Sequence, residues 1–123
     1  MGLLTVLTLS ACAPAVTSTE PVGYQAGYDE VFDYVHYLMS VATPFEVASA
    51  NRYSGSITAE YRVGAPGRTT STWGVVAAIT GSSRVSAVGF VKFSDNPLGP
   101  SIPIQNELIR FIQDQLDRRF RRA

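Results

Sequence analysis

Two pairs of strand-like segments, each joined by a short turn, constrain the fold of this chain more than any other feature. Residues 56–63 alternate apolar and polar side chains, which is typical of a strand with one buried and one solvent-facing side. Residues 45–50 precede them across the turn-forming residues 51–55, so a hairpin is predicted. A second hairpin is predicted over 72–80 and 84–93, around a three-residue loop. Because sequential hairpins form antiparallel sheets, we expect a four-stranded antiparallel sheet.

Amphipathic helices are predicted on either side of these strands. In residues 27–42 the apolar side chains recur every three or four positions, and Pro44 ends the pattern. Residues 104–121 show the same spacing, after a loop over 95–103 that contains three prolines. The expected fold class is therefore α+β: a two-layer sandwich in the order αββββα, with the N-terminal and the C-terminal helix on one face of the sheet.

The pairing within the second hairpin decides which of its apolar side chains are buried. A three-residue loop would place Ile79 opposite Val85 and direct the odd-numbered apolar residues toward the helices. The opposite face of the sheet would then carry an apolar strip, which marks a candidate binding surface. The strip comprises Val76, Val88 and Phe90. The alternative is that the loop 95–103 folds over it.

The composition excludes several functional classes. A chain of 123 residues with 46% hydrophobic content suits a single globular domain. Ten Lys and Arg balance ten Asp and Glu, which argues against a cationic nucleic-acid-binding protein. One Cys and one His supply too few ligands for a metal centre built on those residues, so we expect no metal and no cofactor.

Few residues suggest catalysis. Asp33 lies three residues before His36 on the first predicted helix, and such a pair could serve as the base of a small hydrolase. The alternative is a surface histidine beside a carboxylate. Because no nucleophile motif accompanies the pair, we expect no enzyme and no catalytic residue. Glu46 and Glu60 could face each other across the first hairpin, either as a carboxylate pair or as two solvated strand residues.

Positive charge gathers at the end of the second predicted helix. It could contact anionic lipid head groups, or it could complement the helix dipole and aid solubility. Asp114 and Asp117 dilute the cluster and favour the second interpretation. The cluster comprises Arg118, Arg119, Arg121 and Arg122.

The first nineteen residues carry no charged side chain and have the pattern of an export signal. The apolar run over residues 3–9 is too short to span a bilayer as a helix, but it matches the apolar region of a signal peptide. It ends in Leu9-Ser10-Ala11-Cys12, which resembles the lipobox of bacterial lipoproteins. In that family the signal peptide is cleaved before the cysteine, whose sulfur then carries a diacylglyceryl group.

The resemblance implies that residues 1–11 are the signal peptide and that Cys12 is the lipidated N-terminus that anchors the chain to a membrane. Ala13 resembles the sorting residue of lipoproteins directed to the outer membrane, so the expected location is the outer membrane, facing the periplasm. No Lys or Arg precedes the apolar run. Signal peptides normally open with positive charge, so either the true start lies upstream of Met1, which we favour, or the signal is a weak one.

The chain after the signal peptide is expected to consist of a flexible tether followed by one domain. Residues 12–21 are small, polar and proline-containing, which predicts a flexible tether after the acylated cysteine. Residues 22–123 would form the single α+β domain.

Most of this domain, residues 28–120, resembles small uncharacterised envelope lipoproteins. The matching motifs are Tyr28-Asp29-Glu30-Val31-Phe32 at the helix start and Gly55-Ser56-Ile57-Thr58-Ala59 in the strand that follows a turn. The resemblance implies a membrane-anchored envelope lipoprotein that acts as a non-enzymatic binding or assembly module, with an envelope protein or a lipid as partner. The alternative is a lipoprotein that binds a small lipid or metabolite in an apolar cavity between helices and sheet.

Overall fold

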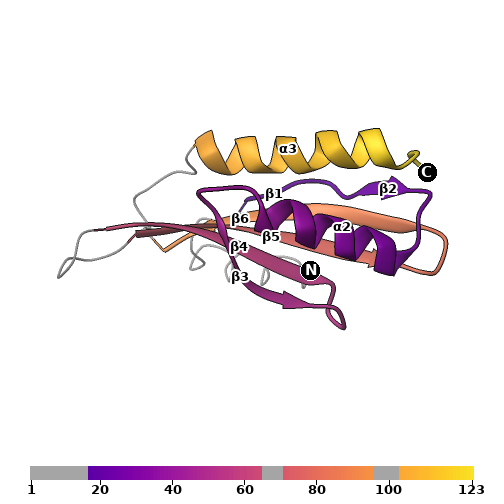
Figure 1. Ribbon diagram of the computed structural model, residues 1–123, viewed down its shortest axis with the longest axis horizontal. Helices are drawn as coiled ribbons and strands as arrows, with labels where there is room; N and C mark the ends of the chain where they lie inside the picture. The colour runs from indigo at the N-terminus through magenta and orange to yellow at the C-terminus, as the bar shows by residue number, and fades with distance from the viewer. Residues whose placement is uncertain (1–16, 65–70, 96–102) are drawn as a thin grey trace, which may run out of the picture.

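The computed structural model consists of one curved antiparallel sheet with two helices packed on one face (Figure 1). It describes residues 17–64, 71–95 and 103–123. The α+β class and the placement of both helices are confirmed, whereas the sheet has six strands instead of four. Along the chain the elements are β1 (Thr17–Ser18), β2 (Val22–Tyr24), α2 (Tyr28–Ser40), β3 (Glu46–Asn51), β4 (Ser56–Val63), β5 (Ser71–Gly81), β6 (Ser86–Ser94) and α3 (Pro103–Arg119).

The four expected strands are β3 to β6, and they pair in the order β6-β5-β4-β3. The alternation of apolar and polar side chains in β4 gives the strand one buried and one solvent-facing side, as predicted. Ile57 and Ala59 are fully buried beneath the helices, while Thr58 and Glu60 on the opposite face are partly exposed. The two-residue period of a strand thus separates the core face from the outer face of the sheet.

The two additional strands lie along β6 at one edge of the sheet. Thr17 of β1 pairs with Lys92 of β6, and Val22 of β2 pairs with Val88 of β6. The residues between them interrupt the ladder, and Pro21 falls in this gap, where its missing N–H costs no strand hydrogen bond. Residues 12–21 were expected to form a flexible tether. Within the described part of this segment, Thr17 and Ser18 pair with β6, and the Thr19 N–H donates to the Phe90 oxygen at 2.8 Å. Residues 1–16, which include Cys12, lie outside the described part of the chain.

The register of the β5–β6 hairpin corrects the sequence prediction. Ile79 pairs with Val88 instead of Val85, because β5 continues to Gly81 and the turn takes the next four residues, 82–85. Gly81 has a φ of +153°, which residues with a side chain rarely adopt. A shift by an odd number of residues turns every side chain of β6 to the other face of the sheet.

The core lies between the two helices and the inner face of the sheet. Among the described residues the buried polar side chains are Ser86, Ser94 and Gln105. Gln105 Nε2 donates to the backbone oxygens of Gly74 at 2.8 Å and Phe93 at 3.0 Å. These bonds fasten the start of α3 over β5 and β6. The largest fully buried apolar side chains are Tyr24, Phe90, Met39, Ile57, Ile79, Ile112 and Leu116.

Candidate functional site

The predicted binding strip on the outer face of the sheet does not form. Val88 and Phe90 are each 1% exposed and lie in the core beneath the helices, because the register of β6 is shifted. Val76 does lie on the opposite face, where it pairs with Val91 and is partly exposed. The three residues therefore belong to different surfaces and share no site.

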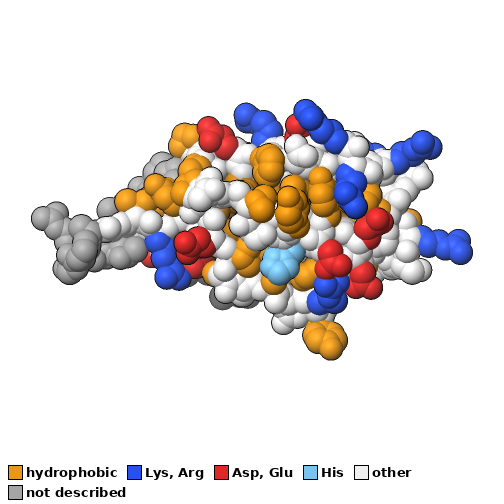
Figure 2. Space-filling view, viewed as in Figure 1, with side chains coloured by type: hydrophobic (Ala, Val, Ile, Leu, Met, Phe, Trp, Pro, Cys, Tyr) orange, Lys and Arg blue, Asp and Glu red, His pale blue; other side chains and the backbone are white. Residues whose placement is uncertain are grey.

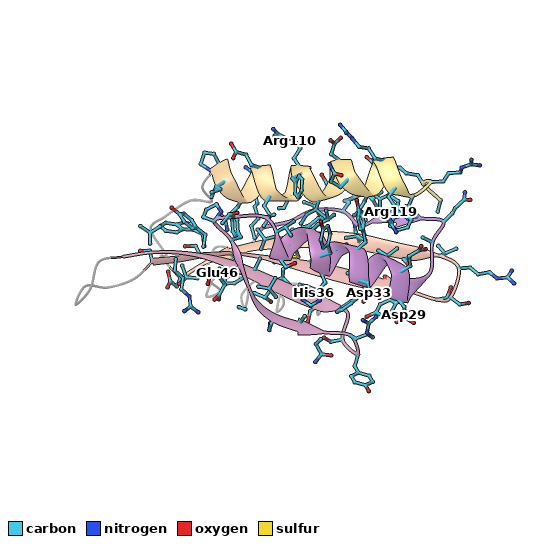
Figure 3. The ribbon with its side chains drawn as sticks, viewed as in Figure 1. Asp29, Asp33, His36, Glu46, Arg110 and Arg119 are labelled. Atoms are coloured by element: carbon cyan, nitrogen blue, oxygen red, sulfur yellow. The ribbon has the colours of Figure 1, made fainter. Side chains whose placement is uncertain are left out.

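Asp33 and His36 lie along the outward side of α2, as Figure 3 shows, but their contacts lead to different partners. The Asp33 carboxylate accepts a hydrogen bond from Arg52 at 2.5 Å, and the same guanidinium donates to Asp29 at 3.0 Å. His36 packs edge-on against the ring of Phe32, with 6.2 Å between ring centroids. Asp33 thus orients an arginine of the β3–β4 turn instead of the imidazole.

Glu46 and Glu60 are direct register partners on β3 and β4, so the expectation that they face each other is confirmed. The Glu60 carboxylate accepts a hydrogen bond from Arg62 at 2.7 Å. Both acids line a shallow hollow of about 390 Å³ together with Pro44 and Tyr61. The arginine neutralises one of the two carboxylates, so the site is an ion pair at the sheet surface. Within the described ranges, no cluster of three or more His, Cys, Asp or Glu side chains could hold a metal ion.

Three of the four clustered arginines, Arg118, Arg119 and Arg122, contact side chains of their own chain. Arg122 donates from Nε and Nη2 to the two carboxylate oxygens of Asp117, at 2.9 Å each. Arg118 pairs with Asp114 at 3.3 Å, and the Arg119 guanidinium lies 4.6 Å from the centroid of the Tyr34 ring. These contacts favour the structural interpretation of the cluster. In the described part of the chain, no helix has the length and apolar character needed to cross a membrane.

An apolar groove lies where α2 ends and α3 begins, and we call it the helix groove. Its volume is about 470 Å³, within the range of roughly 300–1,000 Å³ common for small-molecule sites. Figure 2 shows hydrophobic side chains gathered between the two helices on this side of the molecule. The groove is lined by Val41, Ala42, Thr43, Pro44, Phe45, Ile104, Glu107, Leu108 and Phe111.

Two segments form the described walls of the helix groove. Helix α2 ends at Ser40, and the residues from Val41 to Phe45 that lead into β3 form one wall, while the first turns of α3 form the other. Phe45 and Leu108, exposed by 3% and 4%, contribute the buried part of the lining. Val41 and Phe111 lie at its rim, exposed by 52% and 39%. Large exposed apolar side chains beside a hollow indicate a surface that excludes water when a partner binds.

The sequence pattern did not reveal this groove. Phe111 belongs to the apolar stripe of the second predicted helix, and it was therefore expected in the core. In the structure Phe111 is 39% exposed and lies at the rim of the groove. The one available signal is Val41-Ala42, an apolar pair that continues past the polar Ser40 to the Thr43-Pro44 break.

Neither a protein-family model nor a curated protein matches this chain. Solved structures with a distant likeness to this chain include the following three. A DUF4468 family protein from Bacteroides ovatus has 9% identity and a TM-score of 0.37, over 83% of this chain and 77% of that one. The Zhui aromatase/cyclase from a Streptomyces species has 12% identity and a TM-score of 0.33, over 85% and 86% of the two chains.

The third, the di-domain aromatase/cyclase BexL, has 10% identity and a TM-score of 0.33 over 91% of this chain. The match spans 50% of BexL. All three scores are low, and the assignment of a function to this chain therefore rests on its own residues.

Proposed function

We propose that this chain is a membrane-anchored, non-enzymatic module that binds an apolar ligand in the helix groove. The observation that carries the proposal is the groove itself, with Phe45 and Leu108 buried in its lining and Val41 and Phe111 exposed at its rim. Full burial of an exposed aromatic or aliphatic side chain contributes about 1.5–3 kcal/mol, and Val41 and Phe111, which are 52% and 39% exposed, would each add a part of this on binding.

The groove favours a small apolar ligand over a polar metabolite. Among the described residues of its lining, Glu107 is the one with a charged side chain, and Thr43 supplies a hydroxyl. A site with few polar groups binds through excluded water and shape, and its polar groups then orient the head of the ligand. This chemistry supports the lipid-binding alternative over recognition of a charged metabolite.

The anchor rests on the sequence motif Leu9-Ser10-Ala11-Cys12. Acyl chains contribute about 0.8 kcal/mol for each buried methylene, so two or more chains on Cys12 would hold the domain on a membrane. In this proposal the location is the periplasmic side of the outer membrane, and membrane attachment comes from the lipid.

Ligand binding is tested with the apolar fluorescent probe N-phenyl-1-naphthylamine. The unmodified full chain is expected to bind the probe saturably, and Phe111→Glu is expected to weaken binding by about tenfold, because it places a charge at the apolar rim. Tyr53→Glu is the matched control, since Tyr53 is a fully exposed aromatic outside the groove. Equal affinity in both variants would show that the probe binds elsewhere, and circular dichroism checks that each variant is folded.

The anchor has a separate test. The chain is produced in a bacterium from its upstream start, and its mass is measured after extraction from the membrane fraction. We expect cleavage before Cys12 and the added mass of acyl groups, and we expect Cys12→Ser to leave the protein uncleaved and unacylated. An unmodified thiol in the native chain would remove the anchor from the proposal without affecting the groove.

A further inference from the structure

The two edges of the sheet differ in what covers them. At one edge β1 and β2 pair with β6, and the bridge between Tyr24 and Arg122 continues the pairing beyond β2. At the other edge β3 pairs with β4, and in the described part of the chain no strand lies on its far side (Figure 1). Alternate residues of an edge strand direct their N–H and C=O groups away from the sheet. Strand β3 therefore offers hydrogen-bonding groups to a further strand.

The composition of β3 permits another backbone to approach it. Five of its six residues are exposed, and Val47 is partly buried. Lys and Pro, which commonly protect sheet edges, are absent from this strand. The small side chains of Ala48, Ser49 and Ala50 leave room for a neighbour at the usual spacing of about 4.8 Å. One protective feature is present, a bulge between Val47 and Ser49, and regular pairing with β4 resumes from Ser49 to Asn51.

The first residues of β3 present a carboxylate beside a hollow. Glu46 and its register partner Glu60 line the hollow of about 390 Å³ described above, together with Tyr61 and Arg62. Arg62 pairs with Glu60, whereas within the described ranges no cation pairs with Glu46. Because the hollow borders residues 46–48 of the open edge, a side chain of a strand added there can enter it.

Negative charge is also in excess where β3 ends. Arg52, in the turn that follows, donates to both Asp29 and Asp33, so one guanidinium is shared by two carboxylates. Figure 3 shows these two acids and Glu46 toward the same side of the molecule. Among the described residues that flank the edge, four carboxylates therefore meet two guanidinium groups. The carboxylates are those of Asp29, Asp33, Glu46 and Glu60, and the guanidinium groups are those of Arg52 and Arg62.

We propose that the β3 edge binds an extended segment of a partner protein that carries basic side chains. The segment adds a strand to the sheet, with main-chain hydrogen bonds along β3 and a Lys or Arg side chain in the hollow, paired with Glu46. Backbone pairing supplies affinity for any extended chain, and the excess of carboxylates selects a basic one. The inference uses the sheet edge and not the helix groove, so it holds whether or not the groove binds a ligand.

Charge selection is tested with the full chain and a short fluorescent peptide in which Lys alternates with Val. Fluorescence anisotropy is expected to show saturable binding, and no binding when Glu replaces Lys in the peptide. Glu46→Gln is expected to weaken binding about two- to fivefold, the worth of one exposed ion pair. Glu20→Gln is the matched control, because Glu20 is an exposed carboxylate between β1 and β2 at the opposite edge. Equal affinity of the two variants, or equal binding of the Glu peptide, overturns the inference.

Strand addition is tested with two further peptides, N-methylated on one or the other set of alternate residues. Only one set of N–H groups in an added strand faces β3, so one methylated peptide is expected to lose binding and the other to keep it. If both bind as tightly as the parent peptide, main-chain hydrogen bonds make no contribution, and the contact is not an added strand.

The position of the peptide is read from amide hydrogen exchange of the protein. Peptide binding is expected to slow exchange within Glu46–Asn51 and to leave β1 and β2 unchanged. Protection at β1 and β2 or at the helix groove, without protection in β3, overturns the inference. A dimer of the free protein in sedimentation, with β3 amides already protected, also overturns it, because a second copy would then occupy the edge.

Discussion

Tyr24 illustrates how single side chains hold the end of α3 against the sheet. Its hydroxyl donates to Asp117 at 3.0 Å, and Arg122 donates two hydrogen bonds to the same carboxylate. Burial of the phenol, followed by the hydrogen bond and the negative charge of Asp117, raises the pKa of Tyr24 to about 12. The hydrogen bond from Arg122 lowers the pKa of Asp117. Tyr24, Asp117 and Arg122 thus form one polar link between β2 and α3.

This link predicts a loss of stability at alkaline pH. A tyrosine whose pKa rises from 10.0 to about 12 on folding stabilises the folded state fully below pH 10, and that contribution disappears as the pH rises through about 12. Tyr24→Phe is expected to be less stable than the native protein at neutral pH and to lack this part of the alkaline decline. Urea unfolding measured across this pH range checks it, and parallel pH profiles for the two proteins would contradict it.

At the scale of elements, the side chain of Thr19 bridges the interruption between β1 and β2 along β6. Between β1 and β2 the Thr19 N–H donates to the Phe90 oxygen at 2.8 Å, while the Phe90 N–H donates to the hydroxyl oxygen of Thr19 at 3.0 Å. The side chain thus replaces the backbone acceptor that a continuous strand would supply. Pro21 follows where no strand hydrogen bond is required of it.

The variant Thr19→Val tests the hydrogen bond in which the Thr19 hydroxyl accepts from the Phe90 N–H. The variant keeps the shape of the residue and removes the acceptor, so the partly buried Phe90 N–H loses its partner at a cost of about 1–3 kcal/mol. Thr19→Ser keeps the hydroxyl and is expected to cost less. The measurement is the free energy of unfolding of the native protein and of both variants. If Thr19→Val and Thr19→Ser lose the same stability, the effect comes from packing and not from the hydrogen bond.

Element boundaries were predictable because their signals are local. The first hairpin was expected over 45–50 and 56–63, and its strands are Glu46–Asn51 and Ser56–Val63. The β5–β6 register was not predictable in the same way. Both faces of β6 carry apolar residues, so hydrophobic pattern alone does not choose between registers that bury opposite faces.

On the scale of the whole molecule, the residues after α3 pair with β2 and so connect the last helix to the sheet edge. Gln25 donates its N–H to the Arg121 oxygen at 2.7 Å, and the Ala123 N–H donates to the Gly23 oxygen at 3.0 Å. These bonds extend the sheet edge beyond β2 by pairing with the tail after α3 (Figure 1). The last residues therefore fasten both α3 and the edge strand.

Removal of residues 121–123 tests this closure. The deletion removes both backbone bonds and the Arg122–Asp117 ion pair, and we expect a loss of about 1–3 kcal/mol in the free energy of unfolding. Amide exchange should accelerate at Gln25, whose N–H loses its acceptor, and remain slow in β4 and β5. Unchanged exchange at Gln25 would contradict the role assigned to the tail.

By itself, the sequence determined the helices, the four long strands and the buried faces of β4 and β5, because apolar side chains that recur at the period of a helix or strand lie close together in the sequence. The tertiary structure alone decided which face of β6 joins the core, that residues 17–24 complete the sheet edge, and that a groove opens between α2 and α3. Each of these depends on pairing or packing between segments far apart in the chain, and several arrangements bury similar apolar area until the whole fold selects one.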